Sequence, residues 1–205
     1  MTMSGRIYVI SGPSGAGKSS LVQHLMQGVT GLGYSVSHTS RRPRGSEVDG
    51  VNYHFVDKAT FKNMIEKGGF VEWAEVYQDY YGTSFSSLEG QRARGLDVIM
   101  DVDVQGAENV RRHFKESILI YILPPSLEAL ERRLKERATD DESAIGVRIE
   151  KALKEIKNCT WYDYIIFNED LLKATEEVES VIISERCRTS HQLSKADRLF
   201  KVTSP

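Results

Sequence analysis

A glycine-rich segment near the start of the chain, Gly12-Pro-Ser-Gly-Ala-Gly-Lys18-Ser19, restricts the fold more than any other feature. It matches the pattern G-x-x-x-x-G-K-[ST], in which backbone N–H groups curl around phosphate oxygens. This pattern requires a strand before it and a helix after it. The apolar run at residues 6–11 predicts the strand, and the apolar spacing from Ser19 onward predicts the helix. The alternative is a glycine-rich turn that caps a helix.

The chemistry of such a loop assigns roles to its residues. Lys18 is expected to reach the β and γ phosphates of a nucleoside triphosphate, and the Ser19 hydroxyl to ligate Mg²⁺. The helix N-terminus adds a favourable dipole. The residues expected to bind ATP here are Gly12, Pro13, Ser14, Gly15, Ala16, Gly17, Lys18, Ser19 and Ser20. GTPases, ATPases, transporters and small-molecule kinases share the loop, so it does not identify the acceptor.

Three further apolar runs, at residues 97–102, 118–123 and 161–167, predict buried strands. Such runs, separated by helical segments, predict an α/β fold in which a parallel sheet is covered by helices on both faces, because each strand must be buried on both sides. Residues from about 35 to 86 differ in character, being rich in aromatic residues, Arg, Gly and Thr. We expect them to form an inserted subdomain that contains β-strands.

Helical periodicity dominates the second half of the chain. It covers residues 127–137 and about 144–158, and the polar break at residues 139–143 is where a lid is expected. A terminal helix is predicted over residues 171–188. The polar tail that follows is either a helix that packs against another subunit or a frayed or simply packed terminus, and we favour the latter.

Composition narrows the classes of partner. The formal net charge of -2 gives no overall positive field to attract nucleic acid. The two cysteines, Cys159 and Cys187, lack metal-ligand spacing, which argues against a disulfide framework or a zinc site and fits a reducing cytoplasm. No leader pattern and no run of roughly 20 apolar residues is present. We therefore expect a cytoplasmic protein without nucleic-acid or membrane partners; a homo-oligomer is compatible with this composition.

A second anion site is expected near residues 37–53. This segment gathers Arg41, Arg42, Arg44 and Tyr53 around turn-forming residues. Guanidinium forks bind phosphate oxygens in bidentate fashion and a tyrosine hydroxyl donates one more bond, so the composition suits a phosphate monoester. A solvated basic loop is the open alternative.

Read together, the motifs resemble the guanylate kinase family in content, order and spacing. They are S-x-x-x-R-x-P-R at residues 37–44, G-x-x-Y-x-F at 50–55, Phe-Val-Glu-Trp at 70–73, Tyr-Tyr-Gly-Thr at 80–83 and Asp-Val-Asp-Val-Gln-Gly at 101–106. The resemblance covers about residues 6 to 186. It implies a P-loop nucleoside monophosphate kinase fold over residues 4–186. Its expected parts are a core (about 4–34, 87–126 and 150–186), a GMP-binding subdomain (about 35–86) and a small lid (about 127–149), with residues 187–205 as a helical or disordered extension.

The implied activity is transfer of the γ-phosphate of ATP to GMP, and to dGMP, with Mg²⁺, in purine nucleotide metabolism and GMP recycling. By the same resemblance, the residues that hold the GMP phosphate are Arg41, Arg44, Tyr53 and Tyr81, and those that face the guanine are Ser37, Glu72, Thr83 and Asp103. Guanine presents N1–H and an amine as donors, which need carboxylates, and O6 as an acceptor, which needs a hydroxyl. Taken singly, Glu72 could be a solvated strand residue and Tyr81 a packing residue.

Asp101 and Asp103 follow an apolar strand, at the edge where ligands gather in open parallel sheets. Asp101 is expected to organise the Mg²⁺ shell, directly or through water, and Asp103 to face the base, with the split between the two left open. The alternative is an aspartate that caps the next helix.

Phosphoryl transfer needs alignment and neutralisation of developing charge, so further cations are expected. The resemblance places Arg137 and Arg148 near the triphosphate and the transfer site when the lid closes, and assigns catalysis to Lys18, Arg41, Arg137, Arg148 and Asp101. Arg133 also flanks the lid. Asn168 is expected to contact the adenine or ribose. The alternative for each arginine is an exposed helix face with i,i+4 ion pairs.

Two other functions compete. A non-catalytic interaction module of this family typically has a degraded phosphate loop, whereas Lys18 and Ser19 are intact here. A kinase for AMP, a pyrimidine monophosphate or a sugar would not need the two carboxylates of Glu72 and Asp103.

Overall fold

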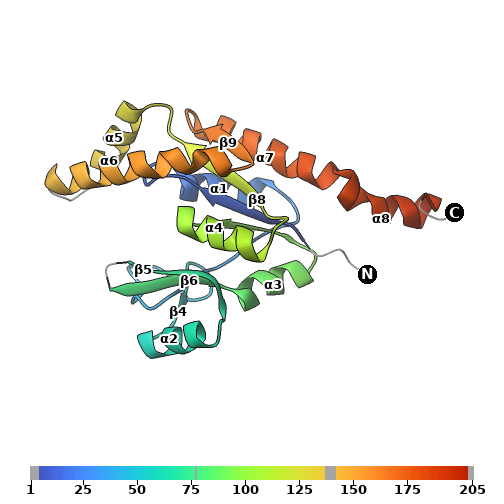
Figure 1. The fold of residues 1–205 in the computed structure, drawn as a ribbon, viewed down its shortest axis with the longest axis horizontal. Helices are drawn as coiled ribbons and strands as arrows, with labels where there is room; N and C mark the ends of the chain where they lie inside the picture. The colour runs from blue at the N-terminus through green and yellow to red at the C-terminus, as the bar shows by residue number, and fades with distance from the viewer. Residues whose placement is uncertain (1–4, 77, 137–141, 203–205) are drawn as a thin grey trace.

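The computed structural model describes residues 5–76, 78–136 and 142–202 of the chain. Its centre is a five-stranded parallel sheet with the order β2-β7-β1-β8-β9 (Figure 1). The strands of this sheet are β1 (Ile7–Ser11), β2 (Leu32–Tyr34), β7 (Asp97–Asp101), β8 (Ile118–Leu123) and β9 (Tyr164–Phe167). Strand β1 lies in the middle with β7 and β8 as its parallel neighbours, so the carboxyl ends of β1 and β7 lie side by side.

Strand β1 explains why the sheet is covered on both faces. Successive side chains of a strand point to opposite faces, and Ile7 and Val9 pack in one hydrophobic cluster while Tyr8 and Ile10 pack in another. All four are at most 3% exposed. A strand that is apolar on both faces is stable only between two layers of helices.

Helices supply those two layers. The cluster of Tyr8 and Ile10 includes residues of α1 (Lys18–Gly28) and α7 (Leu171–Cys187). The cluster of Ile7 and Val9 includes residues of α3 (Phe85–Ala93) and α4 (Val104–His113). The predicted α/β class is therefore confirmed.

A second sheet, with the order β4-β3-β6-β5, lies to one side of the core together with helix α2 (Lys58–Glu66) (Figure 1). Phe61 of α2 is fully buried and stacks on Phe70 and Tyr80, with ring centroids 4.3 and 5.4 Å away. The strands are β3 (His38–Thr39), β4 (His54–Phe55), β5 (Phe70–Val76) and β6 (Asp79–Ser84). All of them lie within the segment expected to form a β-containing insertion.

Several element boundaries differ from the predictions. Strand β2 was not predicted, because Leu32–Tyr34 is too short to show a period. Strand β9 starts three residues later than predicted, since a 3-10 turn occupies Lys157–Trp161. Helix α6 spans Glu142–Ile156, so the end of the expected polar break is already helical; the rest of that break lies outside the described residues.

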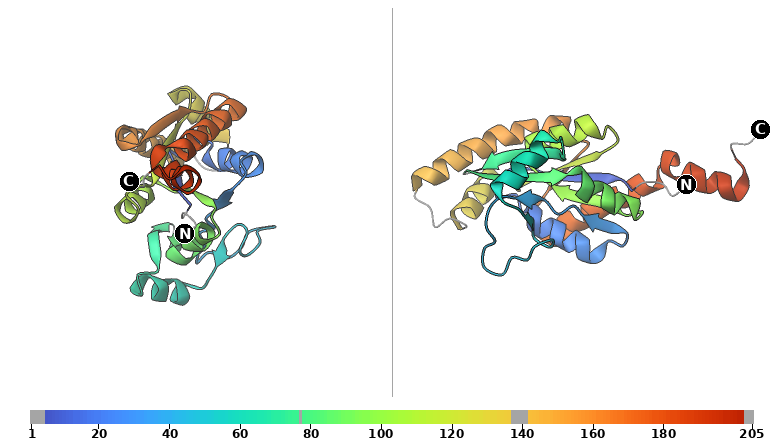
Figure 2. Two further views of the ribbon diagram at one scale, coloured as in Figure 1. Left: turned by 90° about the vertical axis from the view of Figure 1, so that its right-hand side faces the viewer. Right: turned by 90° about the horizontal axis from the view of Figure 1, so that it is seen from below.

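Three further helices belong to the second half of the chain. Helix α5 (Leu127–Glu136) packs on α6 through Leu130, Leu134 and Ala152. In the C-terminal extension, Thr189–Phe200 forms helix α8, which projects from the body beyond α7 (Figures 1 and 2). None of its residues is buried. Among the helices described, none is long and apolar enough to cross a membrane.

A buried carboxylate ties the start of β1 to the end of α7. Asp97 is 5% exposed and accepts hydrogen bonds from the backbone N–H of Arg6 at 2.8 Å and from Arg186 Nε at 2.8 Å. The Arg6 guanidinium also donates to it at 3.2 Å. These donors satisfy the hydrogen-bonding capacity of the buried carboxylate and link the two chain segments.

We predict that Asp97→Ala lowers the free energy of unfolding by about 2–3 kcal/mol, because Arg6 and Arg186 lose their counter-charge but stay partly solvated. Urea titration of both proteins measures the difference. Glu108→Ala is the matched control, since Glu108 pairs with Arg112 on the surface and its loss is expected to cost less than about 0.5 kcal/mol. Equal effects of the two substitutions would contradict the proposed contribution of the Asp97 network.

Candidate active site

The glycine-rich loop between β1 and α1 depends on glycines at two positions of close approach. Gly12 has φ 142°, and a Cβ atom there would lie 2.2 Å from the carbonyl oxygen of Ile122. Gly17 has φ 92°, and a Cβ atom would lie 2.3 Å from Nδ2 of Asn168. A larger residue would clash at either position, so the tight curve of the loop explains both glycines.

The loop ends at the N-terminus of α1, where the first backbone N–H groups have no partner within the helix. The Lys18 Nζ atom lies over the loop and donates to the carbonyl oxygens of Gly12 at 2.6 Å and Pro13 at 3.2 Å. Ser19 and Ser20 follow in the first turn of the helix. Free amides, a helix dipole and a lysine in one place form an anion-binding cradle.

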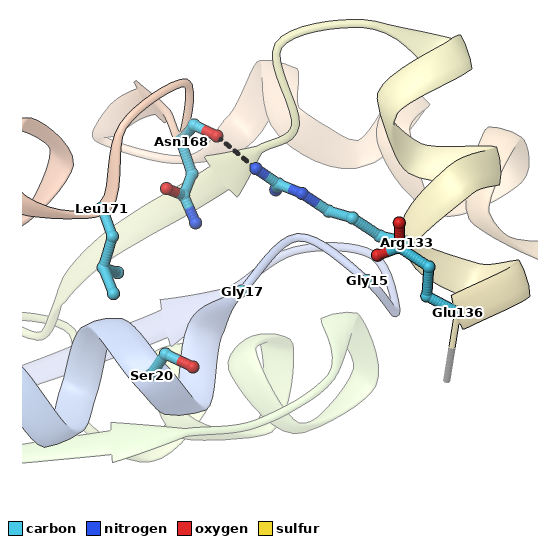
Figure 3. Close-up of a pocket in the computed structure, with 7 residues that line it drawn as sticks. All are labelled: Gly15, Gly17, Ser20, Arg133, Glu136, Asn168 and Leu171. Atoms are coloured by element: carbon cyan, nitrogen blue, oxygen red, sulfur yellow. Dashed lines mark hydrogen bonds between the residues drawn. The ribbon is translucent and has the colours of Figure 1, made fainter. Parts of the chain in front are cut away.

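A pocket of about 260 Å³ opens beside this loop (Figure 3). Asn168 is 4% exposed and donates through Nδ2 to the carbonyl oxygen of Ala16 at 2.8 Å. Arg133 Nη2 donates to the carbonyl oxygen of Asn168 at 3.0 Å, the dashed line in Figure 3. The residues that line the pocket are Gly15, Gly17, Ser20, Arg133, Glu136, Asn168 and Leu171. The structure thus brings Asn168 against the loop from a distant part of the sequence.

Both strand-end aspartates lie at the carboxyl edge of the core sheet, where the loop also lies. Asp101 Oδ1 accepts a hydrogen bond of 2.6 Å from the hydroxyl of Tyr34 on β2. Asp103 Oδ1 accepts from the backbone N–H of Gly106 at 2.8 Å, so it caps helix α4. The capping alternative holds for Asp103, and the cap uses one of its two carboxylate oxygens.

The four residues expected to face a base converge on the second sheet and α4. Glu72 on β5 is paired with Thr83 on β6. The Thr83 hydroxyl lies 3.1 Å from that of Ser37. Burial raises the pKa of Glu72 to about 7, and the charge of Asp103 adds to the rise. A carboxyl on one strand, with the hydroxyls of Thr83 and Ser37 on its neighbours, is suited to recognise a ligand with adjacent donors and an acceptor.

The residues expected to hold a phosphate gather around one arginine. Arg41 is 9% exposed, and its guanidinium carbon lies 5.4 Å from the centre of the Tyr53 ring. The rings of Tyr53 and Tyr81 are 6.0 Å apart. Arg44 is exposed at the surface of the same segment. The solvated-loop alternative does not hold for Arg41, because its guanidinium is buried.

The phosphate loop and this second cluster border one pocket. The pocket has a volume of about 600 Å³, and both Ser19 of α1 and Tyr53 of the second cluster line it. Asp101, Tyr34 and Glu47 line the same pocket. The sequence analysis did not identify Tyr34 or Glu47. Glu47 could have been found from the sequence, because it is a carboxylate within a basic loop. No sequence feature indicates Tyr34, because its contact with Asp101 depends on strand pairing.

The arginines of the expected lid are only partly described. Arg137 lies outside the described residues, whereas Arg148 lies half-buried on α6. Arg133 contacts the loop pocket instead, as described above. Within the described ranges, no group of three or more His, Cys, Asp or Glu side chains is placed to hold a metal ion by itself.

A phosphate loop on a parallel α/β sheet, with a second phosphate-type site across a shared pocket, defines this protein as a P-loop kinase of a small phosphorylated acceptor. The family model described as guanylate kinase matches residues 4–185. The chain belongs to the guanylate kinase family.

Individual guanylate kinases are similar to this chain in sequence and in structure. The guanylate kinase of Syntrophotalea carbinolica is 45% identical over 98% of this chain and 96% of its own length. That of Geobacter metallireducens is 44% identical over 98% of each chain. The crystal structure of guanylate kinase from Anaplasma phagocytophilum superposes with a TM-score of 0.72 at 30% identity, covering 91% of this chain and 89% of that one.

Proposed function

We propose that this protein transfers the γ-phosphate of ATP to GMP, and to dGMP, giving ADP and the nucleoside diphosphate. The observation that supports this acceptor is the half-buried Glu72 carboxyl on β5, paired with Thr83, whose hydroxyl lies beside that of Ser37. The carboxylate would accept from the N1–H and amine of guanine, and a hydroxyl would donate to O6. Adenine presents the opposite pattern, so its monophosphate would leave these groups unpaired.

The acceptor phosphate would lie between Arg41, Arg44, Tyr53 and Tyr81, on the side of the shared pocket that faces the loop. The residues of the loop from Gly12 to Ser20 would bind the triphosphate, with Lys18 on the β and γ phosphates. Two anions that approach each other for in-line transfer repel, and the cations on both sides offset this repulsion.

Mg²⁺ suits the oxygen groups at the centre of the shared pocket. Mg²⁺ prefers hard oxygen ligands, keeps several waters and is bound by one or two protein groups together with substrate phosphates. Ser19 and Asp101 both border the pocket and offer a hydroxyl and a carboxylate. When bound, the ion would neutralise charge on the transferring phosphate. Asp103 would then face the base with the carboxylate oxygen not used in capping α4.

The adenosine of ATP would occupy the pocket at Asn168, beside the loop. The lid, about residues 127–149, would bring Arg137 and Arg148 to the triphosphate on closure and exclude water, and the acceptor subdomain would span about residues 35–86. The two free cysteines, one of them exposed, suit a reducing compartment, and we propose the cytoplasm.

A coupled assay for ADP formation tests this function, with ATP, Mg²⁺ and one acceptor at a time from GMP, dGMP, AMP, CMP, UMP and dTMP. We expect a strong preference for the two guanine nucleotides. Turnover of another monophosphate would keep the kinase and overturn the base assignment. Without turnover of any of them, a binding module would be the better interpretation.

A further inference from the structure

Arg41, the buried arginine of the proposed acceptor site, forms an ion pair with the carboxylate of Glu47. Glu47 lies on the loop between β3 and β4, and its two carboxylate oxygens accept from Arg41 Nη1 at 2.8 Å and Nη2 at 2.9 Å. The same carboxylate accepts from the backbone N–H of Arg44 at 2.7 Å. This bidentate pair uses the geometry in which a guanidinium also binds phosphate.

The hydrogen bonds of Arg41 divide its five N–H groups into two sets. Both hydrogens of Nη1 are engaged, one by Glu47 and one by the carbonyl oxygen of Arg42 at 2.7 Å. One hydrogen of Nη2 is engaged by Glu47. The other two, on Nε and Nη2, lie together on the opposite edge of the guanidinium and form its second bidentate fork. Tyr81, which we place at the acceptor phosphate, lies next to Tyr53, with 6.0 Å between the two ring centres.

Packing restrains the plane of the guanidinium. Its central carbon lies 5.4 Å from the ring centre of Tyr53 and 5.8 Å from that of Phe55. Aromatic rings limit tilting, and a bidentate carboxylate at one edge stops rotation about the long axis of the side chain. The pKa of Glu47 is lowered to about 2, chiefly by the Arg41 hydrogen bonds, so the pair stays ionic at neutral pH.

We propose that Glu47 is a positioning residue of the acceptor site, which holds the Nη1/Nη2 edge of Arg41 so that the Nε/Nη2 edge faces the GMP phosphate. This inference rests on the proposed function. Glu47 acts through Arg41 and does not itself touch the phosphate. Its contribution is therefore to the affinity for a phosphorylated acceptor and not to the affinity for the base.

Substitution of Glu47 by glutamine tests the proposal, because the amide keeps the shape but turns one acceptor into a donor that faces a guanidinium N–H. We expect Glu47→Gln to raise KM for GMP by roughly 10- to 100-fold, as for loss of a charge-assisted hydrogen bond, with a smaller change in kcat and an unchanged KM for ATP. Inhibition by guanosine, which lacks the phosphate, is expected to stay the same. Glu66→Gln, on an exposed glutamate of α2, is the matched control and should leave all of these values unchanged.

A second variant separates positioning from general disturbance. Lysine at position 41 has no fork to orient, so adding Glu47→Gln to Arg41→Lys should raise KM for GMP by less than about threefold, well short of the effect of Glu47→Gln alone. An unchanged KM in Glu47→Gln would overturn the proposal. So would a lower KM, which would make Glu47 a competitor of the phosphate, or an equal loss of guanosine affinity, which would show distortion of the subdomain. Failure of the parent protein to phosphorylate GMP would instead reject the proposed function.

Discussion

Replacement of Lys18 by methionine is expected to lower kcat for GDP formation by about 100- to 1000-fold, the size of effect seen when one preorganised charge is removed from a transition state. The Lys18 Nζ atom lies over the loop, 2.6 Å from the Gly12 carbonyl oxygen, and we have proposed that it binds the β and γ phosphates. Methionine keeps the length and removes the charge. Single-turnover kinetics with saturating ATP and GMP would measure the loss in the chemical step.

The control for Lys18→Met is Lys195→Met, on the exposed face of α8 away from both nucleotide sites. It removes the same charge and should leave kcat within about twofold, because exposed surface charges have small effects. Circular dichroism and thermal unfolding would verify that both variants fold as the parent does. If Lys18→Met had the kcat of the parent, the glycine-rich loop would not serve catalysis. The alternative, a glycine-rich turn that caps a helix, would then be the better interpretation.

The second large effect is expected at Glu72. Glu72→Gln should lower kcat/KM for GMP by about 1000-fold or more, because the amide presents donors to the donors of guanine and leaves buried polar groups unpaired. ATP binding, measured by fluorescence titration, should hardly change. Combination with Asp103→Asn should weaken GMP turnover further. Glu75→Gln, an exposed glutamate on the same strand, is the control and should behave as the parent.

Equal activity of Glu72→Gln and the parent would rule out the proposed contacts to the base. The pH dependence of KM for GMP provides an independent test of these contacts. Burial raises the pKa of Glu72 to about 7, above its usual value, so below pH 7 the empty site holds a neutral carboxylic acid. In the proposed function, the guanine of GMP binds to the charged form. The KM for GMP is therefore expected to rise as the pH falls from 8 to 6, and Glu72→Gln should lose this pH dependence.

The free energy of unfolding of the empty protein should depend on pH in the opposite direction to GMP binding: the contribution of Glu72 becomes less unfavourable as the pH falls. The folded state binds the Glu72 proton more tightly than the unfolded chain, so this group destabilises the empty protein above about pH 7 and the penalty disappears as the pH falls toward the unfolded pKa. Glu72→Gln should therefore raise the unfolding temperature relative to the parent at pH 8, with a smaller gain or none at pH 5. A gain that is larger at pH 5 would contradict the buried, pKa-raised carboxyl.

Local patterns in the sequence were sufficient for the phosphate loop and for the α/β class. Gly12 and Gly17 indicate a loop whose backbone at these two positions has no room for a Cβ atom. The apolar runs that begin at Ile7, Asp97 and Ile118 are typical of strands buried on both faces. These features are encoded within a few neighbouring residues. Their physical causes, steric exclusion at positive φ and burial of a continuous apolar strand, are local as well.

The acceptor motifs identified a group of residues, and the structure decided which of them meet. Ser37 and Thr83 are 46 residues apart in sequence, yet their hydroxyls lie 3.1 Å apart because β3 and β6 pair in one sheet. Tyr34 became a partner of Asp101 through the short strand β2, which has no period to predict it. The sequence left the C-terminal extension as either helical or disordered, and helix α8, which forms there, buries none of its side chains.

The sequence by itself determined the phosphate loop, the order of the core strands along the chain, and the residue types that suit a guanine nucleotide. Only the tertiary structure decided that Asp103 caps α4, that Glu72 is buried enough to have its pKa raised, and that Glu47 takes one edge of Arg41. The reason is that hydrogen-bond partners and burial depend on which distant segments come together. A side chain's type limits what it can bind, but its neighbours in space determine its charge and orientation.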